Sequence, residues 1–212
     1  MAIKRLTSTC CSTDGKPMLR QGDTGDWVGT FEGHKGAVWG VDLNSNATKA
    51  ASGAADFSAK IWDAVSGEEE ATLAHNHIVK SVNFSADSQL LATGSNDKKL
   101  RIFDLDNHTD GPLTVFEGHT SGLKQVQTLV QLKKNCKRSS NMQYCQVLFS
   151  GNDQTLISAG DDKTLRLWDT RTGKEMAKTD FSGAIGGIEL SKDGDTITVA
   201  HGNSVTFCDS IS

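Results

Sequence analysis

Three polar residues spaced along one stretch of the chain have the side-chain types of a nucleophilic triad. They are His34, Ser52 and Asp56, and an indole follows at Trp62. In triad hydrolases, a histidine oriented by a carboxylate takes the proton of a serine hydroxyl, which then attacks the substrate. If the three side chains met beside a substrate pocket, this stretch would hold an active site.

The same residue types recur at the same spacing, which argues against catalysis. His34 and Trp62 stand 28 positions apart, and Asp56 precedes Trp62 by six. A second set repeats both spacings 41 residues further on, and a third repeats the spacing of six: His75, Thr93, Asp97 and Phe103, then His119, Ser158, Asp162 and Trp168. An active site occurs once in a chain, whereas a structural set recurs in every repeat. We therefore predict three structural tetrads and no enzyme, with no catalytic residue and no cofactor.

The repeat indicates the elements that must position these residues. A period of about 41 residues that opens with Gly-His and closes with Trp-Asp is typical of a WD-repeat blade, a sheet of four antiparallel strands. Buried imidazole, hydroxyl and indole groups each cost free energy unless they are paired, so linked tetrads would hold the turns of each blade. Phe103 and Arg20 stand at the tryptophan position of their repeats and lack the indole N–H, so we expect incomplete tetrads there.

The repeats divide the chain into blades. We expect an unstructured leader at 1–13 and an all-β, incomplete propeller over 14–212. The predicted repeats cover 14–33, 34–74, 75–118, 119–179 and 180–212, of which the first lacks its front half and the last its outer strand. His119 and Trp168 stand 49 positions apart instead of 28, an excess of 21. We assign this excess to an insertion at 127–147, between the inner strand and the second strand.

Composition restricts the classes of function. The chain has 212 residues, a net charge of −4 and no apolar run of the length that spans a bilayer, so neither a polyanion-binding surface nor a membrane segment is expected. The five cysteines form no disulfide pattern, which indicates a reducing compartment. Cys136 and Cys145 lack the paired ligands of a zinc site, so no metal is expected. The basic run 133–138 fits a solvated loop, with nuclear import or RNA contact as the alternative. Trp39, on a predicted inner strand, is interpreted as core or channel lining.

Four stretches carry a closer resemblance than a generic repeat does. They read Asp-Gly-Lys-Pro-Met-Leu-Arg-Gln-Gly-Asp-Thr-Gly-Asp-Trp at 14–27, Gly-His-Lys-Gly-Ala-Val-Trp at 33–39, Ala-Asp-Phe-Ser-Ala-Lys-Ile-Trp-Asp-Ala-Val-Ser-Gly at 55–67 and His-Ile-Val-Lys at 77–80. Together they resemble the serine/threonine kinase receptor-associated protein family, also called unr-interacting proteins. The WD-repeat subunit of translation initiation factor three is the alternative.

The resemblance implies a seven-bladed, non-enzymatic scaffold in the cytoplasm and nucleus. It implies protein partners, namely the survival-of-motor-neuron complex that assembles spliceosomal ribonucleoproteins and the transforming-growth-factor-β receptor pathway. It implies no sequence-specific nucleic acid, membrane or small-molecule substrate. Loops beside the Gly-His motifs are the expected docking sites, with Lys35, Asn96, Lys98 and Thr120 as candidates.

Seven blades need roughly 290 residues, which is more than this chain has. We therefore expect a truncated or mis-spliced product in which 127–147 is a retained intron. A transcript that joins the codons of Val126 and Leu148 directly would support this hypothesis. A non-functional fragment is the second alternative to the scaffold.

Overall fold

The computed structural model describes residues 7–107, 111–125, 147–149, 155–191 and 196–209, and every regular element there is a β-strand. In chain order the strands are β1 Thr7–Cys10, β2 Met18–Gln21, β3 Trp27–Thr30, β4 Val38–Leu43, β5 Lys49–Ala54, β6 Ser58–Asp63, β7 Glu69–Ala74, β8 Val79–Phe84, β9 Leu90–Ser95, β10 Leu100–Asp104, β11 Thr114–Phe116, β12 Leu123–Gln125, β13 Val147–Phe149, β14 Thr155–Gly160, β15 Thr164–Asp169, β16 Glu175–Asp180, β17 Ile185–Leu190, β18 Thr196–His201 and β19 Ser204–Asp209.

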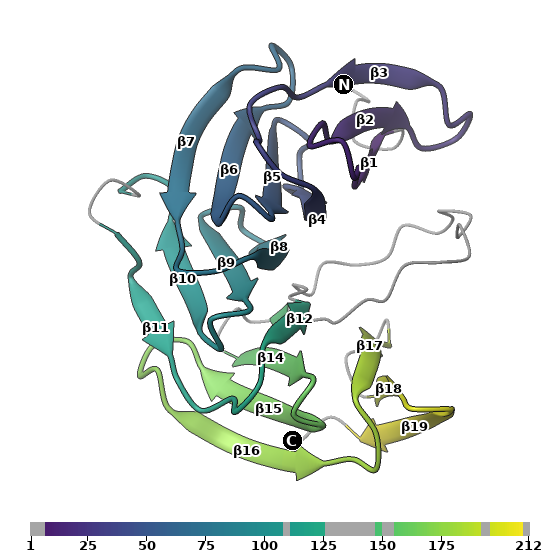
Figure 1. The fold of residues 1–212 in the computed structure, drawn as a ribbon, viewed down its shortest axis with the longest axis vertical. Coiled ribbons are helices and arrows are strands. Elements are labelled where there is room, and N and C mark those ends of the chain that lie inside the picture. The colour runs from purple at the N-terminus through teal and green to yellow at the C-terminus, as the bar shows by residue number, and fades with distance from the viewer. Residues whose placement is uncertain (1–6, 108–110, 126–146, 150–154, 192–195, 210–212) are drawn as a thin grey trace.

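Within the described residues these strands form five antiparallel sheets. Their orders are β1-β2-β3, β4-β5-β6-β7, β8-β9-β10-β11, β12-β14-β15-β16 with β13 also on β14, and β17-β18-β19. The sheets follow one another around an arc, with β4, β8 and β12 toward its centre and β7, β11 and β16 on its outside (Figure 1). The predicted all-β, propeller-like fold is confirmed.

Neighbouring blades pack face to face because the middle strands of the second, third and fourth sheets are buried on both sides. Ile61 of β6 and Leu91 of β9 belong to one apolar cluster that joins the second and third sheets. The backbones approach closely there, since a Cβ on Gly53 would lie 2.7 Å from a methyl carbon of Val79. The stacked blades therefore hold the loops at their ends in fixed positions.

The first sheet corrects the predicted leader. Strand β1 pairs along its whole length with β2, from Thr7 opposite Gln21 to Cys10 opposite Met18. The prediction of an unstructured leader over 1–13 is therefore wrong at residues 7–10, and this sheet has three strands rather than the back half of a blade. Thr-Ser-Thr-Cys shows no apolar alternation, so the pairing depends on the neighbouring strand rather than on a local pattern.

The fourth sheet changes where the excess residues enter the blade. Strands β12 and β13 both lie along the same edge of β14, with Gln125 opposite Ala159 and Val147 opposite the next residue, Ser158. The inner strand is thus made of two pieces, and the intervening chain leaves it in mid-strand rather than after its end. Val147 belongs to the blade, which corrects the predicted boundary by one residue. The rest of 127–147, with Cys136, Cys145 and the basic run, lies outside the described residues.

Candidate functional site

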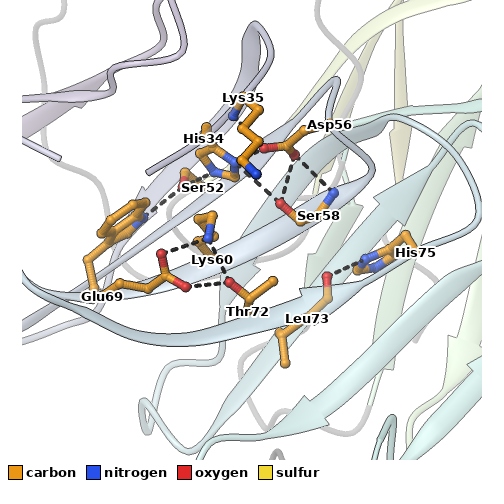
Figure 2. Close-up of polar contacts among 11 residues, drawn as sticks. His34, Lys35, Ser52, Asp56, Ser58, Lys60, Glu69, Thr72, Leu73 and His75 are labelled. Carbon is orange, nitrogen blue, oxygen red and sulfur yellow. Dashed lines mark hydrogen bonds and ion pairs between the residues drawn. The ribbon is translucent and has the colours of Figure 1, made fainter. Parts of the chain in front are cut away.

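The tetrad of the second sheet is fully connected. His34 lies in the loop between β3 and β4, Ser52 on β5, Asp56 in the β5–β6 turn and Trp62 on β6. The His34 ring contacts Asp56 Oδ2 through Nδ1 at 2.8 Å and Ser52 Oγ through Nε2 at 2.7 Å (Figure 2). The indole N–H of Trp62 donates to the same Ser52 oxygen at 2.8 Å. One hydroxyl therefore joins an inner loop to both middle strands.

The tetrad of the fourth sheet has the same geometry despite the interrupted inner strand. His119 contacts Asp162 Oδ2 at 2.8 Å and Ser158 Oγ at 2.7 Å, and Trp168 donates to Ser158 at 2.7 Å. The backbone N–H that follows each histidine, of Lys35 and of Thr120, also donates to the aspartate. The structure thus brings together all four predicted residues in both blades.

The tetrad of the third sheet is only half connected. His75 Nε2 contacts Thr93 Oγ1 at 2.8 Å, but its Nδ1 donates to the Leu73 carbonyl at 3.0 Å instead of to a carboxylate. Asp97 accepts two N–H groups of Arg101, at 2.6 and 3.2 Å. Phe103 packs beside His75 and offers no donor. The missing indole was visible in the sequence, whereas the loss of Asp97 to Arg101 was not.

A second repeated set of side chains was missed in the sequence. Lys60 on β6 donates to Glu69 and Thr72 of β7, at 2.6 and 2.7 Å (Figure 2). The same position on β15 is Arg166, which pairs with Glu175 of β16 at 2.5 Å. These ion pairs join the third and fourth strands of each blade. A basic residue two positions before each tryptophan could have revealed them.

The His–Ser–Asp geometry resembles a triad but cannot act as one. Ser52 is 0% exposed, and its oxygen already accepts the indole N–H of Trp62. Burial lowers the pKa of His34, so the ring is neutral, carries its proton on Nδ1 toward Asp56 and accepts the Ser52 proton on Nε2. The hydroxyl is fully buried and engaged by both His34 and Trp62, so it presents no surface to a substrate carbonyl. The arrangement favours a structural role.

The carboxylates of the two connected tetrads are strongly held. Burial alone would raise the pKa of Asp56, but hydrogen bonds from Ser58, Lys35 N–H and His34 outweigh it and lower the pKa. The same balance, with His119 as the main partner, lowers the pKa of Asp162. Both carboxylates therefore stay ionised well below neutral pH, where they hold the loop and the turn together.

The four candidate docking residues lie at one end of the blades. Successive antiparallel strands place the loop before each inner strand beside the turn between the second and third strands. Lys35 and Thr120 occupy the loops of the second and fourth blades, and both side chains are exposed. Asn96 and Lys98 belong to the β9–β10 turn, where Asn96 N–H donates to the Ile78 carbonyl of the neighbouring loop. We call this end of the blades the loop face.

The outer sheets depart from the tetrad pattern. Arg20, at the tryptophan position of β2, donates to the Gly25 carbonyl at 3.0 Å. In the last sheet His201 contacts Thr206 Oγ1 at 2.7 Å and packs against Phe181. Among the described residues, no group of three or more His, Cys, Asp or Glu side chains could hold a metal ion. Nor does that part of the chain contain a helix long and apolar enough to cross a membrane.

Comparison with known families agrees with this geometry. The family model described as WD domain, G-beta repeat, matches residues 25–63, 67–104 and 134–169, which is more than half of the chain. This chain belongs to the WD-repeat family. The third match begins inside the segment 127–147, so the assignment of that segment as an insertion stays a prediction.

Similarity to individual proteins confirms the resemblance predicted from the four quoted stretches. The serine-threonine kinase receptor-associated proteins of Mus musculus and Homo sapiens are each 47% identical over 207 residues, which is 98% of this chain and 52% of theirs. That of Dictyostelium discoideum is 39% identical over 98% of this chain and 62% of its own length. The subunit I of eukaryotic translation initiation factor 3 from Culex quinquefasciatus is 30% identical over 88% and 55%. The chain spans about half the length of the curated relatives it matches.

Proposed function

We propose that this WD-repeat chain is a non-enzymatic scaffold of the serine/threonine kinase receptor-associated protein type. The observation that carries the proposal is the 47% identity that extends over 98% of the chain. The structure supports a scaffold because its catalytic-looking side chains are buried and mutually paired. Lys35, Lys98 and Thr120, by contrast, are exposed on the loop face.

In this proposal the partners are proteins. The chain acts with the survival-of-motor-neuron complex in assembling spliceosomal ribonucleoproteins, and with components of the transforming-growth-factor-β receptor pathway. It works in the cytoplasm and nucleus, and it takes no membrane, small-molecule substrate or sequence-specific nucleic acid. Lys35, Asn96, Lys98 and Thr120 form part of the docking surface on the loop face.

Affinity capture from cell extract tests the proposal. The tagged chain should retain survival-of-motor-neuron and spliceosomal assembly components, identified by mass spectrometry. Retention of translation initiation factor three subunits would favour the alternative with 30% identity. Recovery of chaperones alone would favour a non-functional fragment. A second sample tests the docking surface. The chain with Lys35 and Thr120 both changed to Glu should retain less of the assembly components than the parent chain if the loop face is the docking surface.

A further inference from the structure

Two aromatic side chains on the loop face are only about half buried. Trp39, near the start of β4, is 47% exposed, and Phe57, in the β5–β6 turn, is 45% exposed. Trp39 is therefore not a core residue, and its alternative interpretation as channel lining on the inner strand stays a prediction. Exposed aromatic rings are enriched at the centres of protein interfaces, where they are buried by the partner.

Phe57 occupies a backbone position that disfavours a large side chain. Its φ is +67°, and the equivalent turn residues Lys98 and Lys163 have φ values of +71° and +64°. The turn after each tetrad aspartate therefore requires a left-handed residue, and in the first sheet Gly15 fills the place at φ +83°. Because the positive φ recurs from blade to blade, it belongs to the turn itself, and what is particular to this blade is the bulky aromatic that occupies the position.

Both aromatic rings contact the same short segment of the next blade. The Phe57 ring lies 5.3 Å from the His77 ring, and the Lys80 ammonium lies 5.3 Å from the centre of the Trp39 ring. His77 and Lys80 are three residues apart, which is about 10 Å of extended chain. The two aromatic rings and this segment therefore form one surface, about as long as a few residues of a bound peptide.

The charges around this surface are uneven. Lys35 and Lys98 are exposed, and their ammonium groups form no ion pair among the described residues. The Asp97 carboxylate is neutralised by Arg101, whereas Asp56 keeps its negative charge, with its oxygens occupied by hydrogen bonds from His34, Ser58 and the Lys35 N–H. Glu32 and Glu117 are likewise paired, with Lys16 and Lys99. The charge left available to a partner on this surface is positive.

We propose that Trp39, Phe57, His77 and Lys80, flanked by Lys35 and Lys98, bind an extended acidic peptide segment of a partner protein that inserts an apolar side chain between the two aromatic rings. Lys35 and Lys98 would pair with its carboxylates, and the rings would cover its apolar side chain. A peptide fits better than a nucleic acid because the chain carries a net charge of −4, which opposes the long-range attraction on which nucleic-acid binding depends. This inference rests on the proposed scaffold function and names the chemistry of one of its partners.

The test is selection of a displayed random-peptide library on the chain, followed by fluorescence anisotropy of the most enriched peptide. We expect enriched peptides to be acidic with one aromatic or aliphatic residue, and to bind about tenfold more weakly to Phe57→Gly. Glycine suits the positive φ, so this variant should fold at least as well as the parent. Val65→Ser is the matched control, because Val65 is exposed in the turn at the opposite end of the same blade. Its affinity should be unchanged.

Several results would refute the proposed peptide-binding surface. They are enrichment of basic or uncharged peptides, no enrichment, equal binding by Phe57→Gly, or stronger binding of a single-stranded oligouridine than of the selected peptide. Capture of ribonucleoprotein assembly components by a chain that selects no acidic peptide would refute this surface and leave the proposed scaffold function standing. Selection of acidic peptides by a chain that captures no assembly component would do the reverse.

Discussion

The blades β4–β7 and β8–β11 share a four-strand plan but differ in how their buried polar groups are joined. In the first, His34 links Asp56 to Ser52, and Lys60 reaches outward to Glu69. In the second, Arg101 binds Asp97, and His75 donates instead to the Leu73 carbonyl of β7, in the preceding blade. The same positions thus form one connected network in one blade and two separate pairs in the other. The tetrad aspartate is therefore held by a histidine in the first blade and by an arginine in the second.

This difference predicts unequal effects of removing the histidine. His34→Ala leaves the Asp56 carboxylate and the Ser52 hydroxyl without their shared partner, so we expect a loss of about 4 kcal/mol of unfolding free energy. His75→Ala should cost about 2 kcal/mol, because Asp97 keeps Arg101. Urea denaturation of both variants measures the two values. An unchanged unfolding curve for His34→Ala would refute the tetrad as a structural device.

The partner of the aspartate offers the reverse comparison. Arg101→Met strips a largely buried carboxylate of its ion pair, and we expect it to lose about 3 kcal/mol. Lys60→Met, at the same position of the other blade, should lose about 1 kcal/mol, because Asp56 is held by His34. The two midpoints in urea give the comparison directly. Equal losses would mean that Arg101 does not substitute for a histidine.

The His75 imidazole, which has no carboxylate partner, should make the stability of the chain depend on pH. Burial, followed by the charge of Arg101, lowers the pKa of His75 to about 4 from an ordinary value near 6.5. The unfolded chain therefore binds a proton between these values that the folded chain does not, so stability falls as the pH is lowered from 6.5 to 4. We expect this residue to account for about 2–3 kcal/mol of that fall. His75→Gln should flatten the dependence when the free energy of unfolding is measured across this range. A slope as steep as in the parent chain would assign the effect to other groups.

A second dependence on pH, opposite in sign, concerns the inner strands. Asp42 of β4 accepts the Phe84 N–H of β8 at 2.8 Å, and the same register position of β8 is Asn83. Burial raises the pKa of Asp42 to about 7, so ionising it costs free energy that grows as the pH rises from about 4 to 7. Asp42→Asn should therefore stabilise the chain by about 2 kcal/mol more at pH 8 than at pH 5. Thermal unfolding at the two pH values checks this, and an equal shift at both would contradict it.

Much of the tetrad arrangement could be predicted from the regular spacing of its residues along the sequence. Repetition of His, hydroxyl, Asp and Trp places each residue on a fixed strand or turn, and buried polar groups must then find one another. The failures have other causes. Strand β1 forms because β2 offers an edge, although Thr-Ser-Thr-Cys has weak strand character. The split inner strand is decided by which residues pair with β14, and no local pattern around Val147 indicates the boundary.

The sequence by itself determined the repeated blade, the all-β fold, the residues of the tetrads and the family, because periodic positions become periodic contacts in a stacked sheet. Only the tertiary structure decided which partner each buried group takes. Asp97 forms its ion pair with Arg101 rather than with His75, and the Phe57 ring contacts the His77 ring where two blades pack together. Which of two possible partners a buried group binds depends on small differences in distance between side chains on separate elements, and spacing along the chain does not encode these distances.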